Sequence, residues 1–206
     1  MQRSCYAAVS LCLAAVLLLG AGSFCAAGEF SPAQMKTMGV FLSNFTELGL
    51  CDIDSRDFLD PQHPERMIRF GIWHNYVNNY KSRIRPCAVR GCPWGGLTLD
   101  GAYVTESIRR YFGYMFTAHG DVQNDHIRCH YDGTRYHFDG ADGEAVYHVR
   151  VKEAETGADG LVHMRGELYL LDDASQSGGV CTAAAQPAEW KGKPSWTLVR
   201  LECSRR

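Results

Sequence analysis

The spacing of apolar residues changes after residue 119, and this change constrains the fold more than any other feature of the chain. Before it, apolar side chains recur every three or four residues, as on one face of a helix. After it, apolar and polar side chains alternate, as in strands with one buried face. The sequence therefore predicts a single α+β domain over residues 28–206. Residues 28–118 are expected to be mainly helical and residues 119–206 mainly antiparallel sheet.

Two helices are predicted over residues 32–48 and 64–84, and a third is expected to follow Thr105 as its N-cap. The second of these has the strongest pattern, because its apolar residues are spaced by three and four and Pro64 suits a first turn. Those apolar residues are Met67, Phe70, Trp73, Val77, Tyr80 and Ile84. The helices are expected to pack on one face of a curved sheet.

Three consecutive hairpins are predicted in the C-terminal half. They pair residues 126–131 with 134–139, 145–153 with 161–171, and 179–185 with 196–203. Asp132-Gly133 is a strong two-residue turn signal for the first of them. Successive hairpins form an antiparallel meander, here of about five or six strands. A cystatin-like or NTF2-like arrangement fits this order, as an analogy of fold that carries no function.

The first 27 residues are typical of a secretory signal peptide. They contain one charge, Arg3, then an apolar run over residues 7–21 and small residues up to Ala27. The run is shorter than the ~20 residues of a membrane span, and no other run is long enough, so no transmembrane segment is expected after cleavage. The predicted location is the periplasm or the cell exterior. Lipidation at Cys25 is the alternative, although the bulky Phe24 before it disfavours that cleavage.

Six cysteines remain after cleavage, and an even number in an exported chain predicts disulfides. They are Cys51, Cys87, Cys92, Cys129, Cys181 and Cys203. Cys87 and Cys92 close a tight loop between two prolines, and Cys181 and Cys203 flank a turn signal near residue 192. Cys51 then pairs with Cys129 by elimination. A metal site is the alternative interpretation, but the two-residue spacings of paired zinc motifs are absent.

Histidine and arginine alternate with apolar residues along the predicted strands. His126, Arg128, His130, His137, His148, Arg150, His163 and Arg165 all fall on the face opposite the apolar one. Such a face can bind an anion, more strongly at low pH, or a transition metal. It can also be an ordinary solvated face, since antiparallel sheets commonly keep one side wet. A register slip of one residue would move every histidine to the other face.

His74 and Asn78 form a polar patch on the helix predicted over residues 64–84. Side chains of this kind bind ligands in a cleft, or tie neighbouring loops to the helix. The chain has none of the serine hydrolase, zinc protease, phosphate-loop or dinucleotide motifs, so no cofactor and no enzyme class is predicted. The paired carboxylates of a glycosidase are defined by their separation in space, so the sequence does not show whether this chain has them. The net charge of −2 does not fit a general nucleic-acid binder.

Several stretches together resemble a group of uncharacterised exported proteins and lipoproteins of bacteria. They are FLSNFTELGL at 41–50, FGIWHNYVNNYKSRI at 70–84, RYFG at 110–113, ADGE at 141–144 and GELY at 166–169. The resemblance implies a bacterial envelope protein that is one compact unit. It implies no activity, cofactor or site residue, and the cysteines are not part of the shared pattern.

The leading hypothesis from the sequence is a non-enzymatic domain that binds a small anionic ligand or an envelope partner. Its ligand would meet the His/Arg face or a helix–sheet cleft near His74 and Asn78. The alternative is a periplasmic or secreted hydrolase with Asp, Glu and His as acid–base residues. A buried acid or histidine with a shifted pKa inside a cleft would favour the enzyme.

Overall fold

The computed structural model describes residues 30–140, 146–173 and 175–205. The predicted signal peptide and the alternative lipidation site at Cys25 lie outside the described residues. Within the described ranges, none of the helices combines the length and the apolar character that a membrane crossing requires.

Four helices lie in the N-terminal half: α1 (Pro32–Thr46), α2 (Ser55–Phe58), α3 (Glu65–Arg83) and α4 (Gly101–Phe112). The helices α1 and α3 confirm two predictions to within two residues. At the start of α1, Ser31 accepts a hydrogen bond from the backbone N–H of Gln34, and Gln34 accepts one from the backbone N–H of Ser31. This capping box, with Pro32 next to it, fixes where the helix begins.

The helix α4 begins five residues earlier than predicted. Its N-cap is Asp100, and the left-handed Gly113 ends it. Thr105 is therefore inside the helix, where its hydroxyl donates to the carbonyl oxygen of Phe116 at 3.2 Å. The prediction of Thr105 as N-cap is wrong because the chain passes directly from the strand that ends at Asp100 into the helix.

The long strands form the first sheet, in the antiparallel order β1-β10-β9-β8-β7. The strands are β1 (Asp52–Asp54), β7 (Tyr147–Thr156), β8 (Val162–Leu170), β9 (Ser177–Trp190) and β10 (Lys193–Arg205). From β7 to β10 they form a meander of consecutive hairpins, as predicted. The turn between β9 and β10 falls at Lys191–Gly192, where the sequence places it.

Shorter strands form a second antiparallel sheet in the order β2-β3-β6-β5-β4. The strands are β2 (Arg85–Pro86), β3 (Leu97–Asp100), β4 (Val122–Asn124), β5 (Ile127–Tyr131) and β6 (Arg135–Phe138). The hairpin β5–β6 turns one residue later than predicted, at Gly133–Thr134. The α+β class and the C-terminal meander are confirmed, but the predicted strands divide between two sheets. Alternation shows that a strand has one buried face and does not show which sheet it joins.

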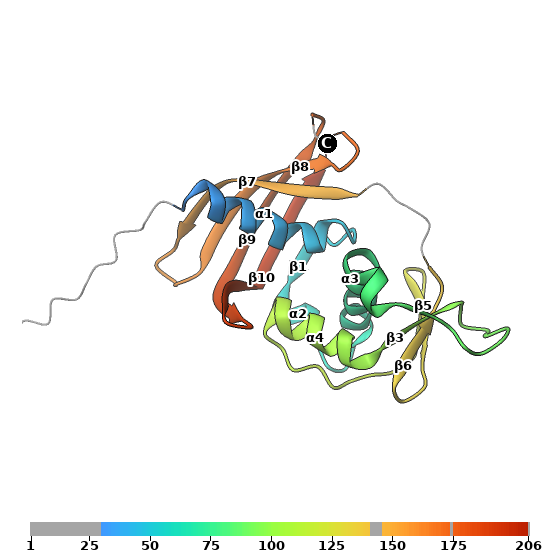
Figure 1. The fold of residues 1–206 in the computed structure, drawn as a ribbon. Helices are drawn as coiled ribbons and strands as arrows, with labels where there is room; N and C mark the ends of the chain where they lie inside the picture. The colour runs from blue at the N-terminus through green and yellow to red at the C-terminus, as the bar shows by residue number, and fades with distance from the viewer. Residues whose placement is uncertain (1–29, 141–145, 174, 206) are drawn as a thin grey trace, which may run out of the picture.

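Helices α2, α3 and α4 lie between the two sheets (Figure 1). Buried apolar side chains from both sheets and all four helices form one continuous cluster. Its centre is aromatic: the ring of Phe45 lies 5.4 Å from that of Phe70, and Phe58 stacks on Phe112 at 4.7 Å. Burying side chains of this size stabilises the fold by about 1.5–3 kcal/mol each.

Helix α1 covers the free edge of β7. Ser43 accepts the backbone N–H of Val149 at 2.9 Å, and Thr46 donates to the carbonyl oxygen of Tyr147 at 2.7 Å. A Cβ on Gly39 would lie 2.7 Å from the carbonyl oxygen of Val149, so only glycine allows this approach. Side chains of the helix thus satisfy backbone groups that an edge strand leaves exposed.

All six cysteines in the described ranges are free thiols, so the predicted disulfides are not formed in this structure. Cys181 and Cys203 do lie directly opposite each other on β9 and β10, as their predicted pairing requires. The pairing of Cys51 with Cys129 is wrong. The backbone N–H of Cys203 donates to the carbonyl oxygen of Cys51 at 2.8 Å, which places Cys51 beside the first sheet. Cys129 is buried in β5 of the second sheet.

Candidate functional site

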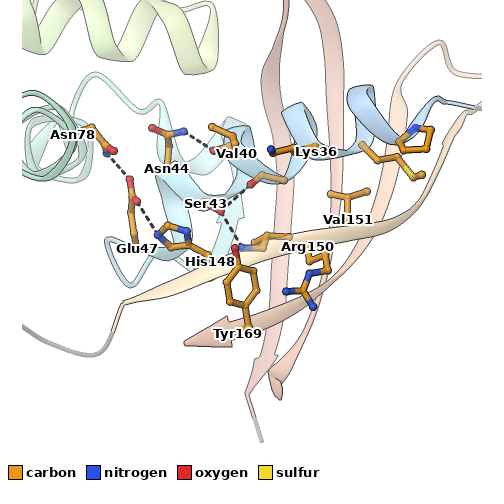
Figure 2. A pocket seen from close by; sticks show the side chains of 14 residues that line it. Lys36, Val40, Ser43, Asn44, Glu47, Asn78, His148, Arg150, Val151 and Tyr169 are labelled. Carbon is orange, nitrogen blue, oxygen red and sulfur yellow. Dashed lines mark hydrogen bonds and ion pairs between the residues drawn. The ribbon is translucent and has the colours of Figure 1, made fainter. Parts of the chain in front are cut away.

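A groove of about 530 Å³ runs between α1 and the edge strand β7. Figure 2 shows its polar side chains, which come from α1, α3, β7 and β8. They include Lys36, Glu47, Asn78, His148, Arg150 and Tyr169. Met35, Val40 and Val151 supply apolar surface along the same groove.

A buried carboxyl group lies at one end of the groove. The side chain of Glu47 is only 6% exposed, and it accepts a hydrogen bond from Nδ2 of Asn78. Burial raises the pKa of Glu47, although the hydrogen bond from Asn78 lowers it in part. Glu47 is also the C-cap of α1, where the helix dipole disfavours an anion. A carboxyl group in this place holds its proton to a higher pH than usual.

His148 faces this carboxyl from β7. Its Nε2 lies 3.7 Å from Oε2 of Glu47, and its ring lies 5.9 Å from that of Tyr169. Burial lowers the pKa of His148. Burial therefore moves the pKa values of Glu47 and His148 towards each other, because it favours the neutral form of each group. Paired groups of this kind can take up and release a proton, which is the feature that favours acid–base chemistry.

Further along the groove, the charged side chains are cations. Lys36 on α1 and Arg150 on β7 are both exposed, and neither has a carboxylate partner among the described residues. The guanidinium of Arg150 lies 4.9 Å over the ring of Tyr169, which orients it. Lys152, two residues further on, differs because it pairs with Glu167 at 3.0 Å. The groove thus has two cations that are available to an anion.

His74 lies behind the groove and does not line it. It is 3% exposed, stacks on Phe70 and contacts the ring of Tyr111 edge-on. Its Nδ1 lies 3.5 Å from Nδ2 of Asn78. Burial, together with the nearby charges of Arg110 and Arg83, lowers the pKa of His74 to about 3. A neutral, buried imidazole supports Asn78 here, so the predicted direct binding role of His74 is not what the geometry shows.

The predicted His/Arg face is not one surface. His148 and Arg150 lie in the groove with Asn78, whereas His126, Arg128, His130 and His137 belong to the second sheet and its turns. His163 and Arg165 lie on β8, where they contact Asp159 at 3.1 Å and Glu153 at 3.9 Å. The prediction is wrong because it assigned four strands to one sheet.

The sequence analysis missed Lys36 and Glu47. Both are on α1, whose polar residues look like an ordinary solvated face. The only sequence signal for Glu47 is its place at the end of a helix, where a carboxylate is disfavoured. Its partner His148 is about a hundred residues further along the chain, and sequence spacing shows no relation between them.

We compared the chain with family models, curated proteins and solved structures, and nothing in any of the three matches it. The function is therefore argued from the groove itself.

Proposed function

We propose that this protein is an exported bacterial envelope domain that binds a small organic anion in the groove between α1 and β7. The observation that carries the proposal is the pair of exposed cations, Lys36 and Arg150, that lie along the groove without a carboxylate partner among the described residues. A cation whose partner is missing in the free protein is available to a ligand of opposite charge.

The lining favours a carboxylate with an apolar part. The planar guanidinium of Arg150 can bind both oxygens of a carboxylate at once. Met35, Val40 and Val151 offer apolar surface to the rest of the molecule. The volume of about 530 Å³ lies within the range of about 300–1,000 Å³ that small-molecule sites have.

Binding can be tested by NMR titration of the purified chain with sodium benzoate, and separately with sodium phosphate. We expect saturable shifts of the Lys36 and Arg150 amides with benzoate. The variant Arg150→Met should bind at least tenfold more weakly, because it keeps the stem of the side chain and loses the charge. Lys152→Met is the matched control, since it removes a neighbouring cation that already has a partner. Equal weakening in both variants, or no saturable shift, contradicts the proposal.

The proposed location rests on the signal-like first 27 residues and on the resemblance to exported bacterial proteins. Expression of the full chain in a bacterial host, followed by mass spectrometry of the envelope fraction, tests it. Cleavage after Ala27 supports a secreted or periplasmic protein. A diacylglycerol on a chain that begins at Cys25 would show a lipoprotein instead. An uncleaved chain in the cytoplasm overturns the proposed location.

A second candidate function is favoured by Glu47 and His148. Their separation of 3.7 Å and their opposite pKa shifts suit a hydrolase that uses a carboxyl and an imidazole as acid and base. Hydrolysis of p-nitrophenyl acetate between pH 5 and pH 8 tests it. An enzyme should lose at least a hundredfold in rate in both Glu47→Gln and His148→Gln. Equal rates in these variants and in the wild-type protein contradict this function and leave the binding proposal in place.

A further inference from the structure

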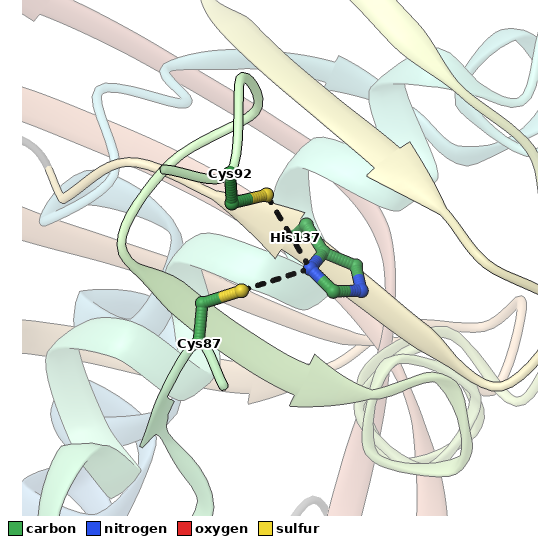
Figure 3. A group of neighbouring side chains, drawn as sticks. All are labelled: Cys87, Cys92 and His137. Carbon is green, nitrogen blue, oxygen red and sulfur yellow. Dashed lines mark hydrogen bonds between the residues drawn. The ribbon is translucent and has the colours of Figure 1, made fainter. Parts of the chain in front are cut away.

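Two cysteines from the loop after β2 meet a histidine on β6, the central strand of the second sheet (Figure 3). Cys87 follows β2, Cys92 lies in the loop after it, and His137 is on β6. The Sγ atoms of Cys87 and Cys92 lie 3.3 Å and 3.7 Å from Nδ1 of His137. All three ligand atoms lie within 4.8 Å of one another. Both thiols therefore converge on one ring nitrogen.

The other nitrogen of His137 is already occupied. Nε2 lies 3.0 Å from Oδ2 of Asp132, so it carries the proton and donates it to that carboxylate. This leaves a lone pair on Nδ1, directed at the two sulfur atoms. Asp132 is itself fixed, because it accepts backbone N–H groups from Thr134 at 2.9 Å and Arg135 at 2.7 Å. A carboxylate that orients a histidine in this way is a common feature of metal sites.

The loop is held in place without any metal. The backbone N–H of Cys87 donates to the carbonyl oxygen of Gly96 at 2.8 Å, and the N–H of Gly96 donates to Asp139 at 3.2 Å. Gly95 has φ +132°, and a Cβ there would lie 2.2 Å from the backbone of Phe138. The two thiols are thus presented to His137 by a loop that lies directly on its strand.

We propose that Cys87, Cys92 and His137 bind one zinc ion, with water or an external ligand in the fourth position. Tetrahedral zinc with bonds of about 2.3 Å to sulfur and about 2.05 Å to nitrogen places those atoms about 3.6 Å apart. The observed 3.3 Å and 3.7 Å bracket that value. Binding releases the two thiol protons to solvent, because the ligands are thiolates. Three protein ligands with one open position are the coordination that zinc enzymes use.

This proposal replaces the predicted Cys87–Cys92 disulfide. A disulfide would use both sulfur atoms, so the two states exclude each other. A zinc ion instead adds a covalent link between the loop and His137 on β6, beside the hydrogen bonds that already hold the loop there. The three-residue cluster shares no residue with the groove, so zinc binding can be measured without any anionic ligand.

Zinc binding can be measured on the full chain, purified with a reductant and a chelator and then exchanged into chelator-free buffer. Titration with zinc chloride against a chromophoric zinc indicator should show one site. Cobalt(II) should give the near-ultraviolet band of sulfur-to-cobalt charge transfer. Cys87→Ser, Cys92→Ser and His137→Gln should each weaken zinc binding at least a hundredfold. Asp132→Asn should weaken it about 10- to 100-fold, because it removes the charge that orients the imidazole.

Cys129→Ser is the matched control, since Cys129 is buried in the same sheet outside the three-residue cluster. It should bind zinc like the wild-type protein. Circular dichroism of each variant separates lost binding from lost folding, and Asp132→Asn keeps all three ligands in case the others fold poorly. No zinc binding by the reduced chain, or equal binding by Cys87→Ser, overturns the proposal. Binding of copper(I) without zinc, or a Cys87–Cys92 disulfide that persists under reductant, also overturns it.

Discussion

The two sheets are built from the same antiparallel hairpins but are stabilised differently. The first sheet has strands of up to 14 residues. Buried apolar side chains pack beneath it, and helix α1 lies along its edge. The second sheet has strands of only two to five residues. It depends on polar side chains that bind backbone, such as Asp121, which accepts the N–H of Tyr131 at 2.8 Å. Its short strands still bury large side chains, Tyr136 and Phe138 among them, so the local polar contacts add to this packing.

Each candidate site lies where its sheet needs support. The groove lies where α1 covers the edge of β7, and the Cys87–Cys92–His137 cluster lies where a loop meets the short strand β6. A ligand in the groove therefore binds where α1 already covers the edge of β7. A metal in the cluster instead cross-links a loop to the short strand β6. Zinc should accordingly protect second-sheet amides from hydrogen exchange far more than a groove ligand protects the first sheet.

Gly95→Ala should have the largest effect, and that effect should be confined to the second sheet. The new Cβ would lie 2.2 Å from the backbone of Phe138, at a φ of +132° that other residues rarely adopt. We expect the free energy of unfolding to fall by about 3 kcal/mol. Urea unfolding measures it, and hydrogen exchange locates it. Gly96→Ala is the matched control, because nothing lies within 4 Å of its Cβ. Similar losses in both variants would mean that the loop simply requires glycine.

Acidification should destabilise both sheets together, through His74 between them. The folded state holds the pKa of His74 at about 3 by burial, whereas the unfolded state has about 6.5. The unfolded state binds the extra proton between these values, so stability falls as pH decreases through 6.5. The expected loss from His74 between pH 7 and pH 5 is about 2 kcal/mol.

Urea unfolding of His74→Leu at both pH values tests this contribution. The variant should lose much less stability on acidification than the wild-type protein, whatever its stability at pH 7. His163→Gln is the control, because His163 lies beside Asp159 at the surface and has no such burial. An unchanged acid response in His74→Leu would show that another group causes it.

Gly39→Ala should have a smaller effect, confined to the first sheet. The added Cβ would lie 2.7 Å from the carbonyl oxygen of Val149 and would push α1 away from β7. Overpacking costs about 1–3 kcal/mol, and alanine regains about 1 kcal/mol of helix propensity, so we expect a net loss of about 1 kcal/mol. Exchange should speed up at the Val149 amide and stay unchanged in β5 and β6. Thr37→Ala, on the exposed side of α1, should show neither change.

The two sheets also differ in how far the sequence predicts them. The helices α1 and α3 and the β7–β8 and β9–β10 hairpins follow from local patterns, because each of these elements is at least nine residues long. The hairpin β5–β6 was predicted with its turn one residue too early and was assigned to the wrong sheet. In the same sheet, β3 is four residues long and β2 is only two, in the stretch 85–96 that looks like a loop. Such short segments have no period to detect.

Neither candidate site could be assembled from the sequence, although most of its residues were noticed. His148 and Arg150 were candidates, but Lys36 and Glu47 lie on another element about a hundred residues earlier. Cys87 and Cys92 were assigned to a disulfide and His137 to a polar face. Only the pairing of β3 with β6 brings the loop before β3 onto the strand of His137. Contacts between distant residues depend on topology, which local patterns do not specify.

Glu47→Gln should have the smallest effect, and its sign should be opposite to the others. Burial raises the pKa of Glu47, so the folded state binds a proton more tightly than the unfolded state, and stability falls as pH rises above about 4.5. A neutral glutamine removes that loss, keeps the shape and can still pair with Asn78. The variant should therefore be slightly more stable than the wild-type protein at pH 7 and equal to it near pH 4. Urea unfolding at both pH values measures the difference. If Glu47→Gln is less stable at pH 7, Glu47 is a structural partner of Asn78 and His148, and the groove loses its candidate acid.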